Sequence, residues 1–219
     1  LTGLLRHGDI KMAILSSRMD PVRGCVMAPE QRQRLAQVLN RHGLWVLEND
    51  SQGGLCFDQQ VEPLHNFIDP ERLMILGAFD KTIGLEAPFG YLLSRHSRPL
   101  WHQQMLLRSF RLPPIRQKAI ARLYSSGQLD RHLQGLRVSL QERTTHLGFM
   151  IEQYLGDDVR FEPPGGGATL WLESAHRVDM TRVFERLLDQ RIVIAPGELF
   201  SVRGLHPQSL CLSGAADWS

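Results

Sequence analysis

The sequence predicts an α/β protein with a parallel or mixed sheet, followed by a small α+β unit. Within residues 11–93, short apolar strands alternate with a helix or with long crossovers, a pattern typical of parallel or mixed sheets. Residues 98–155 show helical spacing of apolar side chains. From residue 156 onward, short strands and Gly/Pro turns surround one helix, which indicates a second, smaller unit.

Four strands are predicted in the first part of the chain. A helix separates the first two: Pro29 stands at an early helical position, where its missing N–H costs nothing, and Gly43 ends the helix. Residues 51–70 are expected to form a long loop. The predicted strands are Lys11–Ser16, Leu44–Glu48, Arg72–Phe79 and Phe89–Leu93.

The second half is predicted to contain three helices before the small unit and one within it, with Asp179 as the N-cap of the last. The predicted helices are Pro99–Phe110, Ile115–Tyr124, Leu129–Leu155 and Asp179–Gln190. The predicted strands are Val159–Phe161, Ala168–Glu173, Ile192–Ile194 and Ser209–Leu212. We therefore expect a division into residues 1–112, connecting helices at 113–155, and a small unit at 156–219.

Composition excludes several classes of function. The 219 residues have a net charge of +2, which provides no electrostatic footprint for nucleic acid or for a membrane surface. Cys25, Cys56 and Cys211 are widely spaced, so they predict no metal site and fit a reducing cytoplasm. No apolar run is long enough to span a membrane, and no signal peptide is visible. Since residue 1 is leucine, we expect this chain to be a fragment with further sequence upstream.

Lys81 is the first candidate functional residue. It follows the buried run Met74–Ala78, and the chain has only two other lysines, Lys11 and Lys118. A lone lysine at the mouth of a strand is a candidate Schiff-base amine, although most lysines after strands are solvated loop residues. Asp20 and Asn49 also follow predicted strands, so the three side chains could share one crevice, or could be ordinary polar loop residues.

Six segments in order carry a family resemblance. They are Asp20–Gly24, Glu48–Ser51, Gly77–Tyr91, Gly127–Arg137, Gly166–Trp171 and Ala195–Phe200. This series resembles the aminotransferase-like domain of MocR-type regulators in the GntR family, which have the fold of fold-type I PLP-dependent (aspartate aminotransferase-like) enzymes. The Arg-His-Leu run within Gly127–Arg137 favours the regulator branch. The resemblance implies part of the large domain of that fold, followed by the small C-terminal α+β domain.

The resemblance also implies pyridoxal 5'-phosphate (PLP) as the cofactor, with no metal. Lys81 matches the lysine that forms the Schiff base. Asn49 falls where the family has the aspartate that pairs with the pyridinium nitrogen, and a neutral amide cannot keep that nitrogen protonated. Ser51 falls where a tyrosine would contact the phenolic oxygen of the cofactor.

Three more family positions are substituted. Asp80 replaces a serine that contacts the phosphate, and Pro88 replaces the arginine that neutralises it. Cys211 falls where the last strand places the arginine that binds a substrate carboxylate. These replacements remove charge-assisted hydrogen bonds, each worth about 1.5–3 kcal/mol, so we expect PLP binding to be weakened or lost.

Three hypotheses follow. The favoured one is an effector-binding and dimerisation domain of a bacterial transcription regulator, without turnover, which forms a homodimer and contacts DNA through an upstream domain. The second is an active PLP-dependent aminotransferase that uses Lys81. The third is a binding domain for a different small ligand.

Overall fold

The structure is a computed structural model that describes residues 10–58, 60–84, 87, 89–95, 99–108 and 112–215. The described chain folds into two compact units. The N-terminal unit contains residues 10–18, 27–55 and 60–136, and the C-terminal unit contains residues 19–26, 56–58 and 137–215. The segment predicted to connect two domains contributes helices α4 and α5, and α5 belongs in part to each unit.

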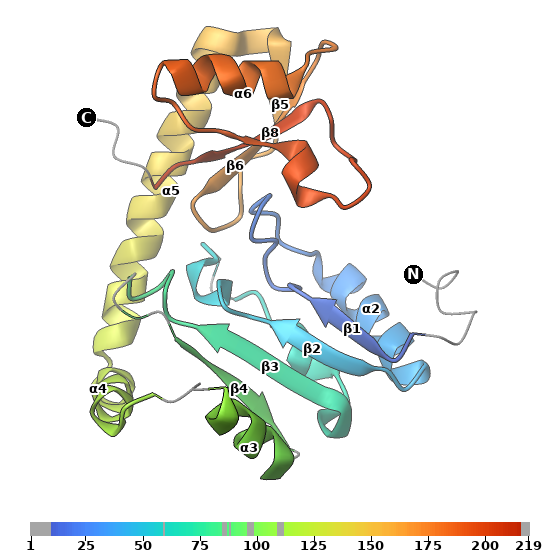
Figure 1. Ribbon diagram of the computed structural model, residues 1–219, viewed down its shortest axis with the longest axis vertical. Helices are drawn as coiled ribbons and strands as arrows, with labels where there is room; N and C mark the ends of the chain where they lie inside the picture. Colours follow the sequence, from blue (N-terminus) through green and yellow to red (C-terminus); the bar gives the residue numbers. More distant parts are fainter. Residues whose placement is uncertain are drawn as a thin grey trace. The chain divides into compact units, whose positions relative to one another are not determined.

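A four-stranded mixed sheet forms the centre of the N-terminal unit (Figure 1). Its strand order is β1-β2-β3-β4, in which the first three strands run parallel and the fourth runs antiparallel to β3. The strands are β1 (Met12–Leu15), β2 (Trp45–Asn49), β3 (Leu73–Ala78) and β4 (Gly90–Ser94). The prediction of an α/β fold with a mixed, mostly parallel sheet is confirmed.

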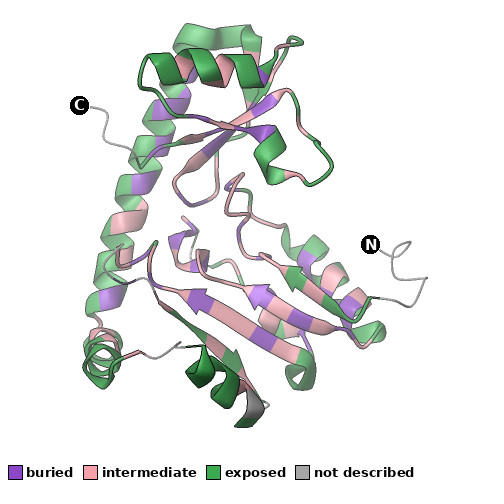
Figure 2. Ribbon diagram, in the orientation of Figure 1, coloured by how far each residue is buried: buried purple, intermediate pink, exposed green. Residues whose placement is uncertain are grey.

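Helix α2 (Pro29–Arg41) covers one face of this sheet. Pro29 stands in its first turn, as predicted, and Gly43 follows the helix with a φ of +58°, which glycine adopts without steric cost. Leu39 is fully buried and packs with Val46 of β2 in the main core of this unit. Figure 2 shows buried segments on both β2 and β3. Ile14 points to the opposite face of the sheet, where its side chain is exposed.

The loop between β2 and β3 is fixed by the carboxylate of Glu48, which is 0% exposed. Glu48 Oε1 accepts hydrogen bonds from the Ser17 hydroxyl and from the Leu64 N–H at 2.9 Å. Its Oε2 accepts from the His65 N–H at 2.8 Å and lies 2.7 Å from His65 Nδ1. Burial alone would raise the pKa of Glu48, but the hydrogen bonds from His65 and Ser17 outweigh burial and lower the pKa below its ordinary value.

The predicted loop at 51–70, apart from residue 59, which the structure does not describe, is held by Glu48 at Leu64 and His65. It contains two short 3₁₀ turns, and a third begins at its last residue: η1 (Gly53–Leu55), η2 (Leu64–Phe67) and η3 (Pro70–Arg72). Downstream of β4, the predicted helices are present as α3 (Pro99–Leu107), α4 (Pro114–Ser125) and α5 (Gln128–Leu155).

A four-stranded antiparallel sheet forms the C-terminal unit, with strand order β5-β6-β8-β7. Leu170 and Leu172 of β6 pack against Leu147 and Ile151 of α5. The unit also contains α6 (Met180–Asp189), η4 (Gly156–Asp158) and η5 (Gly197–Phe200). Its strands are β5 (Val159–Phe161), β6 (Thr169–Ser174), β7 (Ala195–Pro196) and β8 (Ser209–Ser213). Asp179 caps α6 by accepting the Arg182 N–H at 3.1 Å, as predicted.

The predicted strand at Ile192–Ile194 is wrong. Arg191 has a φ of +64°, and the Ile192 N–H donates to the carbonyl of Leu187, so this segment ends helix α6. The run of apolar residues suggested a buried strand, but the side chain of Val193 is 75% exposed. The short strand begins only at Ala195, which pairs with Cys211.

Gly90 should tolerate no side chain. A Cβ at this position would lie 2.1 Å from the backbone oxygen of Gly77, so we expect Gly90→Ala to lower the free energy of unfolding by roughly 1–3 kcal/mol. The matched control is Gly135→Ala on exposed helix surface, where nothing lies within 4 Å and alanine should stabilise by about 0.5–1 kcal/mol. Chemical denaturation followed by circular dichroism measures both, and equal effects would contradict the prediction.

Stability should depend on pH through Glu48. In Glu48→Gln, an amide NH₂ must face donors, so we expect a loss of roughly 2–4 kcal/mol at neutral pH. Because the folded-state pKa is lowered, the contribution of Glu48 is present above the unfolded-state pKa and is lost as pH falls through the folded-state pKa. Denaturation curves of the variant and parent should therefore converge in acid.

The control for this pH series is Glu71→Gln. Glu71 forms an exposed ion pair with Arg95 at 3.3 Å, so its replacement should change stability by less than about 1 kcal/mol. A constant difference between Glu48→Gln and the parent across the acid range would show that the carboxylate is not the source of the effect.

Candidate functional site

The candidate site lies along the carboxyl edge of the parallel strands in the N-terminal unit. Strands β1, β2 and β3 run in the same direction, so the residues that follow them meet at one edge of the sheet (Figure 1). Arg18 follows β1, Asn49 ends β2 with Asp50 and Ser51 after it, and Lys81 follows β3. The structure thus places Asn49 and Lys81 at the same edge, as the sequence predicted.

Lys81 stands in a tight turn after β3. The Ile83 N–H donates to the Phe79 carbonyl at 2.7 Å, and the Phe79 ring packs against Tyr91 and Tyr124. The Lys81 side chain is 56% exposed, and its Nζ lies 3.9 Å from Asp80 Oδ2. An exposed pair of adjacent residues at this distance contributes little to stability, and the amine is open to solvent.

The start of helix α5 packs against this turn. His132 Nε2 lies 2.8 Å from the carbonyl oxygen of Thr82, within hydrogen-bonding distance. The neighbouring Leu133 would contact a Cβ placed on Gly54 at 3.6 Å, so the helix also approaches the loop after β2 closely. The Arg-His-Leu run, noted in the sequence only as a family signature, therefore packs against the lysine turn.

Asn49 and Ser51 are brought together by a local turn. Asn49 Oδ1 accepts the Ser51 backbone N–H at 3.2 Å and the Ser51 hydroxyl at 2.6 Å. The backbone donor fixes the orientation of the amide, because an NH₂ group could not accept that bond. The oxygen of Asn49 is therefore already occupied, and its NH₂ group is the part of the amide that takes no part in these two bonds.

Asp50 and Arg18 were not singled out by sequence reasoning. Arg18 Nη2 lies 3.1 Å from Asp50 Oδ2, and both side chains are mostly buried. Burial raises the pKa of Asp50, and the charge of Glu48 adds to this, while Arg18 opposes it. A Cβ on Gly53 would lie 1.9 Å from Asp50 Oδ1, so a side chain at residue 53 would displace the Asp50 carboxylate from its present position. The available signal was an acidic residue at a strand end followed by two glycines.

The three other predicted positions are Pro88, Asp20 and Cys211. Pro88 is outside the described residues. Asp20 belongs to the C-terminal unit, where its Oδ1 accepts the N–H groups of Val22 and Arg23, both at 2.8 Å. Cys211 lies on β8 in the same unit, where its buried thiol donates to the Val22 carbonyl at 3.6 Å. Burial, and secondarily Asp20, raises the pKa of this thiol, so it stays neutral.

The described residues contain neither a metal-ligand cluster nor a membrane-spanning helix. No cluster of three His, Cys, Asp or Glu side chains there could hold a metal ion. None of the helices in the described ranges combines the length and apolar character that crossing a bilayer requires.

Comparison with known proteins agrees with this architecture. The kynurenine aminotransferase of Pyrococcus horikoshii superposes with a TM-score of 0.84 at 20% identity, over 99% of this chain and 54% of the enzyme. The multiple substrate aminotransferase of Thermococcus profundus gives 0.83 at 21% identity, over 97% of this chain and 53% of the enzyme. At such identities the likeness shows the fold alone.

Among curated proteins, the uncharacterized HTH-type transcriptional regulator YjiR of Escherichia coli is 25% identical over 96% of this chain and 45% of its own length. The HTH-type transcriptional regulator NorG of Staphylococcus aureus is 22% identical over 94% of this chain and 46% of its own. The 2-aminoadipate transaminase of Thermus thermophilus is 25% identical over 92% and 52%, respectively.

This chain thus spans about half the length of the relatives that it matches. The family described as aminotransferase class I and II matches residues 20–216. With that match covering most of the chain, and with the same fold in the solved enzymes, the chain belongs to the aminotransferase class I and II family.

Proposed function

We propose that this chain is the effector-binding and dimerisation domain of a bacterial transcription regulator, built on an aminotransferase fold and without turnover. The similarity to YjiR, NorG and the probable rhizopine catabolism regulatory protein MocR supports a regulator. In this proposal, DNA is contacted by a helix-turn-helix domain outside this chain, and the protein acts in the cytoplasm as a homodimer.

The observation that carries the proposal is that the side-chain oxygen of Asn49 is hydrogen-bonded to Ser51. A protonated PLP ring nitrogen is a hydrogen-bond donor that an anionic carboxylate stabilises. Here Asn49 is neutral, and its oxygen already accepts two hydrogen bonds from Ser51. What remains for a ligand is an NH₂ group, which is the wrong partner for a pyridinium N–H.

The environment of Lys81 argues in the same direction. Asp80 carries a carboxylate beside the lysine, where a PLP phosphate would need donors. A like charge at ~4 Å costs roughly 4 kcal/mol at an effective dielectric of about 20. The resemblance also implies that Pro88 and Cys211 replace two arginines. These residues therefore do not fit PLP.

Two other functions predict different results. An active PLP-dependent aminotransferase would use Lys81, and the similarity to the 2-aminoadipate transaminase is the observation that supports this second hypothesis. A binding domain for another ligand, outside transcription, would share the altered edge but would not be joined to a DNA-binding partner domain.

The decisive measurement is the visible absorbance of the full-length protein after addition of PLP. We expect the parent protein to show no visible absorbance band that depends on Lys81, because Asn49 and Asp80 oppose cofactor binding. As the positive arm, the triple variant Asn49→Asp, Asp80→Ser, Pro88→Arg should bind PLP at least about tenfold better than the parent, since it restores charge-assisted contacts.

A Lys81-dependent band in the parent protein would revive the enzyme hypothesis and refute this one. Sequence-specific DNA binding by the full-length protein, together with dimer formation in analytical ultracentrifugation, is expected from the regulator assignment. A folded protein that binds no DNA would favour the third hypothesis.

A further inference from the structure

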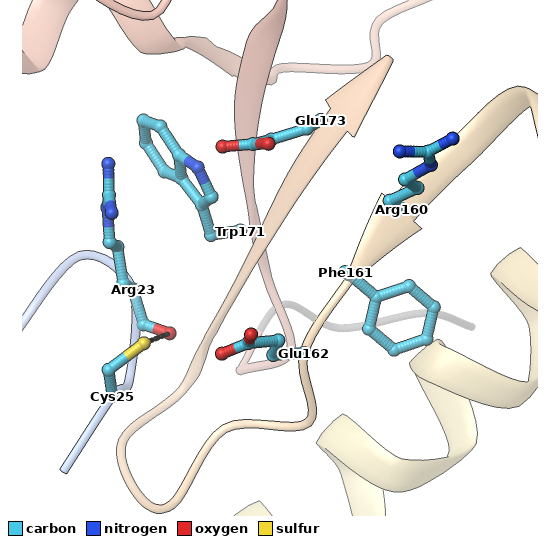
Figure 3. Close-up of a pocket in the computed structure, with 7 residues that line it drawn as sticks. All are labelled: Arg23, Cys25, Arg160, Phe161, Glu162, Trp171 and Glu173. Carbon is cyan, nitrogen blue, oxygen red and sulfur yellow. Dashed lines mark hydrogen bonds between the residues drawn. The ribbon is translucent and has the colours of Figure 1, made fainter. Parts of the chain in front are cut away.

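The C-terminal unit contains a pocket of about 320 Å³ that the aminotransferase comparison does not assign (Figure 3). It lies between the turn at residues 20–25 and one face of the β5-β6 pair. This volume is at the small end of the range for ligand sites in proteins. The lining residues are Arg23, Cys25, Arg160, Phe161, Glu162, Trp171 and Glu173.

Strand register explains why the charged side chains meet here. Phe161 pairs with Leu172, and both face the core against α5. Side chains alternate along strands, so Arg160 and its partner Glu173 face the opposite side, together with Trp171. Figure 3 shows the Phe161 ring turned toward the helix while the other side chains surround the opening.

Arg23 reaches this face from a rigid turn. Two N–H groups of the turn bind Asp20 Oδ1, and Gly24 has a φ of +68°, with no room for a Cβ beside Pro164. The Arg23 guanidinium lies 5.1 Å from the centre of the Trp171 ring, and its Nη2 lies 3.2 Å from His206 Nε2. The guanidinium is therefore held in place before any ligand arrives.

Trp171 supplies an independent indication of a ligand. The residue is 8% exposed, and its Nε1 is buried without a hydrogen-bond partner among the described residues. A buried, unpaired donor is costly, and native proteins rarely retain one. The indole N–H thus lacks an acceptor in a pocket that also contains a pre-positioned guanidinium.

The lining is balanced in charge rather than purely cationic. Arg23 and Arg160 face Glu162 and Glu173, and no ion pair within 4 Å joins any two of the four in the part of the chain that the structure describes. Burial, followed by the charges of Asp20 and Glu162, raises the pKa of the Cys25 thiol, so the thiol lines the pocket as an uncharged group.

We propose that this pocket binds a small zwitterion, with its carboxylate on Arg23 and the Trp171 indole N–H and its ammonium group on Glu162 and Glu173. A ligand with only an anionic group would give the balanced lining a net negative charge and leave Glu162 and Glu173 without an ammonium partner, and a purely cationic one would leave Arg23 and the indole unsatisfied. The inference rests on the proposed function only in taking this chain to bind a small effector. It requires neither PLP nor Lys81.

The test uses full-length protein carrying isotope-labelled tryptophan, titrated with each standard L-amino acid at millimolar concentration and followed by the indole N–H resonance of Trp171. The chain has four tryptophans, and Trp171→Phe assigns the resonance by its loss. At least one amino acid should shift that resonance. Calorimetry should then show binding about ten- to a hundredfold weaker in Arg23→Gln and about fivefold weaker in Trp171→Phe.

Matched ligands and variants make the result decisive. If leucine is the ligand, isocaproate lacks its ammonium group and isoamylamine lacks its carboxylate, so both should bind at least tenfold more weakly; for another amino acid, the corresponding acid and amine serve. Arg116→Gln, on an exposed position of α4, and Lys81→Ala should bind the ligand like the parent.

Three results would overturn the inference: no shift of the Trp171 resonance with any amino acid, equal binding of the acid analogue, or loss of binding in Lys81→Ala. A circular dichroism spectrum matching the parent confirms that Arg23→Gln is folded. Arg23→Lys keeps the charge but loses the planar guanidinium that can donate two hydrogen bonds to a carboxylate, so it should bind with intermediate affinity. Because this titration contains no PLP, its failure is separate from the appearance of a Lys81-dependent PLP band, which refutes the proposed function.

Discussion

The buried carboxylate of Glu48 is the interaction on which the N-terminal unit depends most. It is fully buried at the end of β2, and four donors from Ser17, Leu64 and His65 satisfy it. A charge buried this deeply is tolerated only when every acceptor position is used. The same bonds therefore fix both the end of the central strand and the long loop that returns to β3.

This arrangement separates the stability of the fold from the chemistry of its edge. The apolar core around Leu39 and Val46, together with Glu48, holds the sheet without any contribution from Lys81, which is solvated. Residues at the carboxyl edge can therefore change while the sheet persists. The aminotransferase fold by itself does not establish aminotransferase activity, and the site must be judged on its own groups.

The pocket in the C-terminal unit, if it binds the ligand that we propose, would give such a fold a binding site that does not depend on a cofactor. Its groups come from a short turn and from two neighbouring strands of one sheet, so they are positioned inside a single compact unit. A guanidinium held against Trp171 and His206 loses little side-chain entropy when a carboxylate binds. Recognition of this kind needs no covalent chemistry.

The sequence by itself determined the α/β class, the position of nearly every helix and strand, and the placement of Asn49 and Lys81 at one sheet edge. These follow from local periodicity and from the direction of parallel strands, which act over short stretches of chain. It failed at Ile192–Ile194, where a helix end with a left-handed residue resembled a strand.

Only the tertiary structure decided which partners the polar groups have. Glu48 meets His65 across 17 residues, and Arg23 meets His206 across 183. No local pattern encodes such pairs, because they depend on how distant segments pack. The burial of Glu48 and the lack, among the described residues, of an acceptor for the Trp171 indole could therefore be recognised only once the chain was folded.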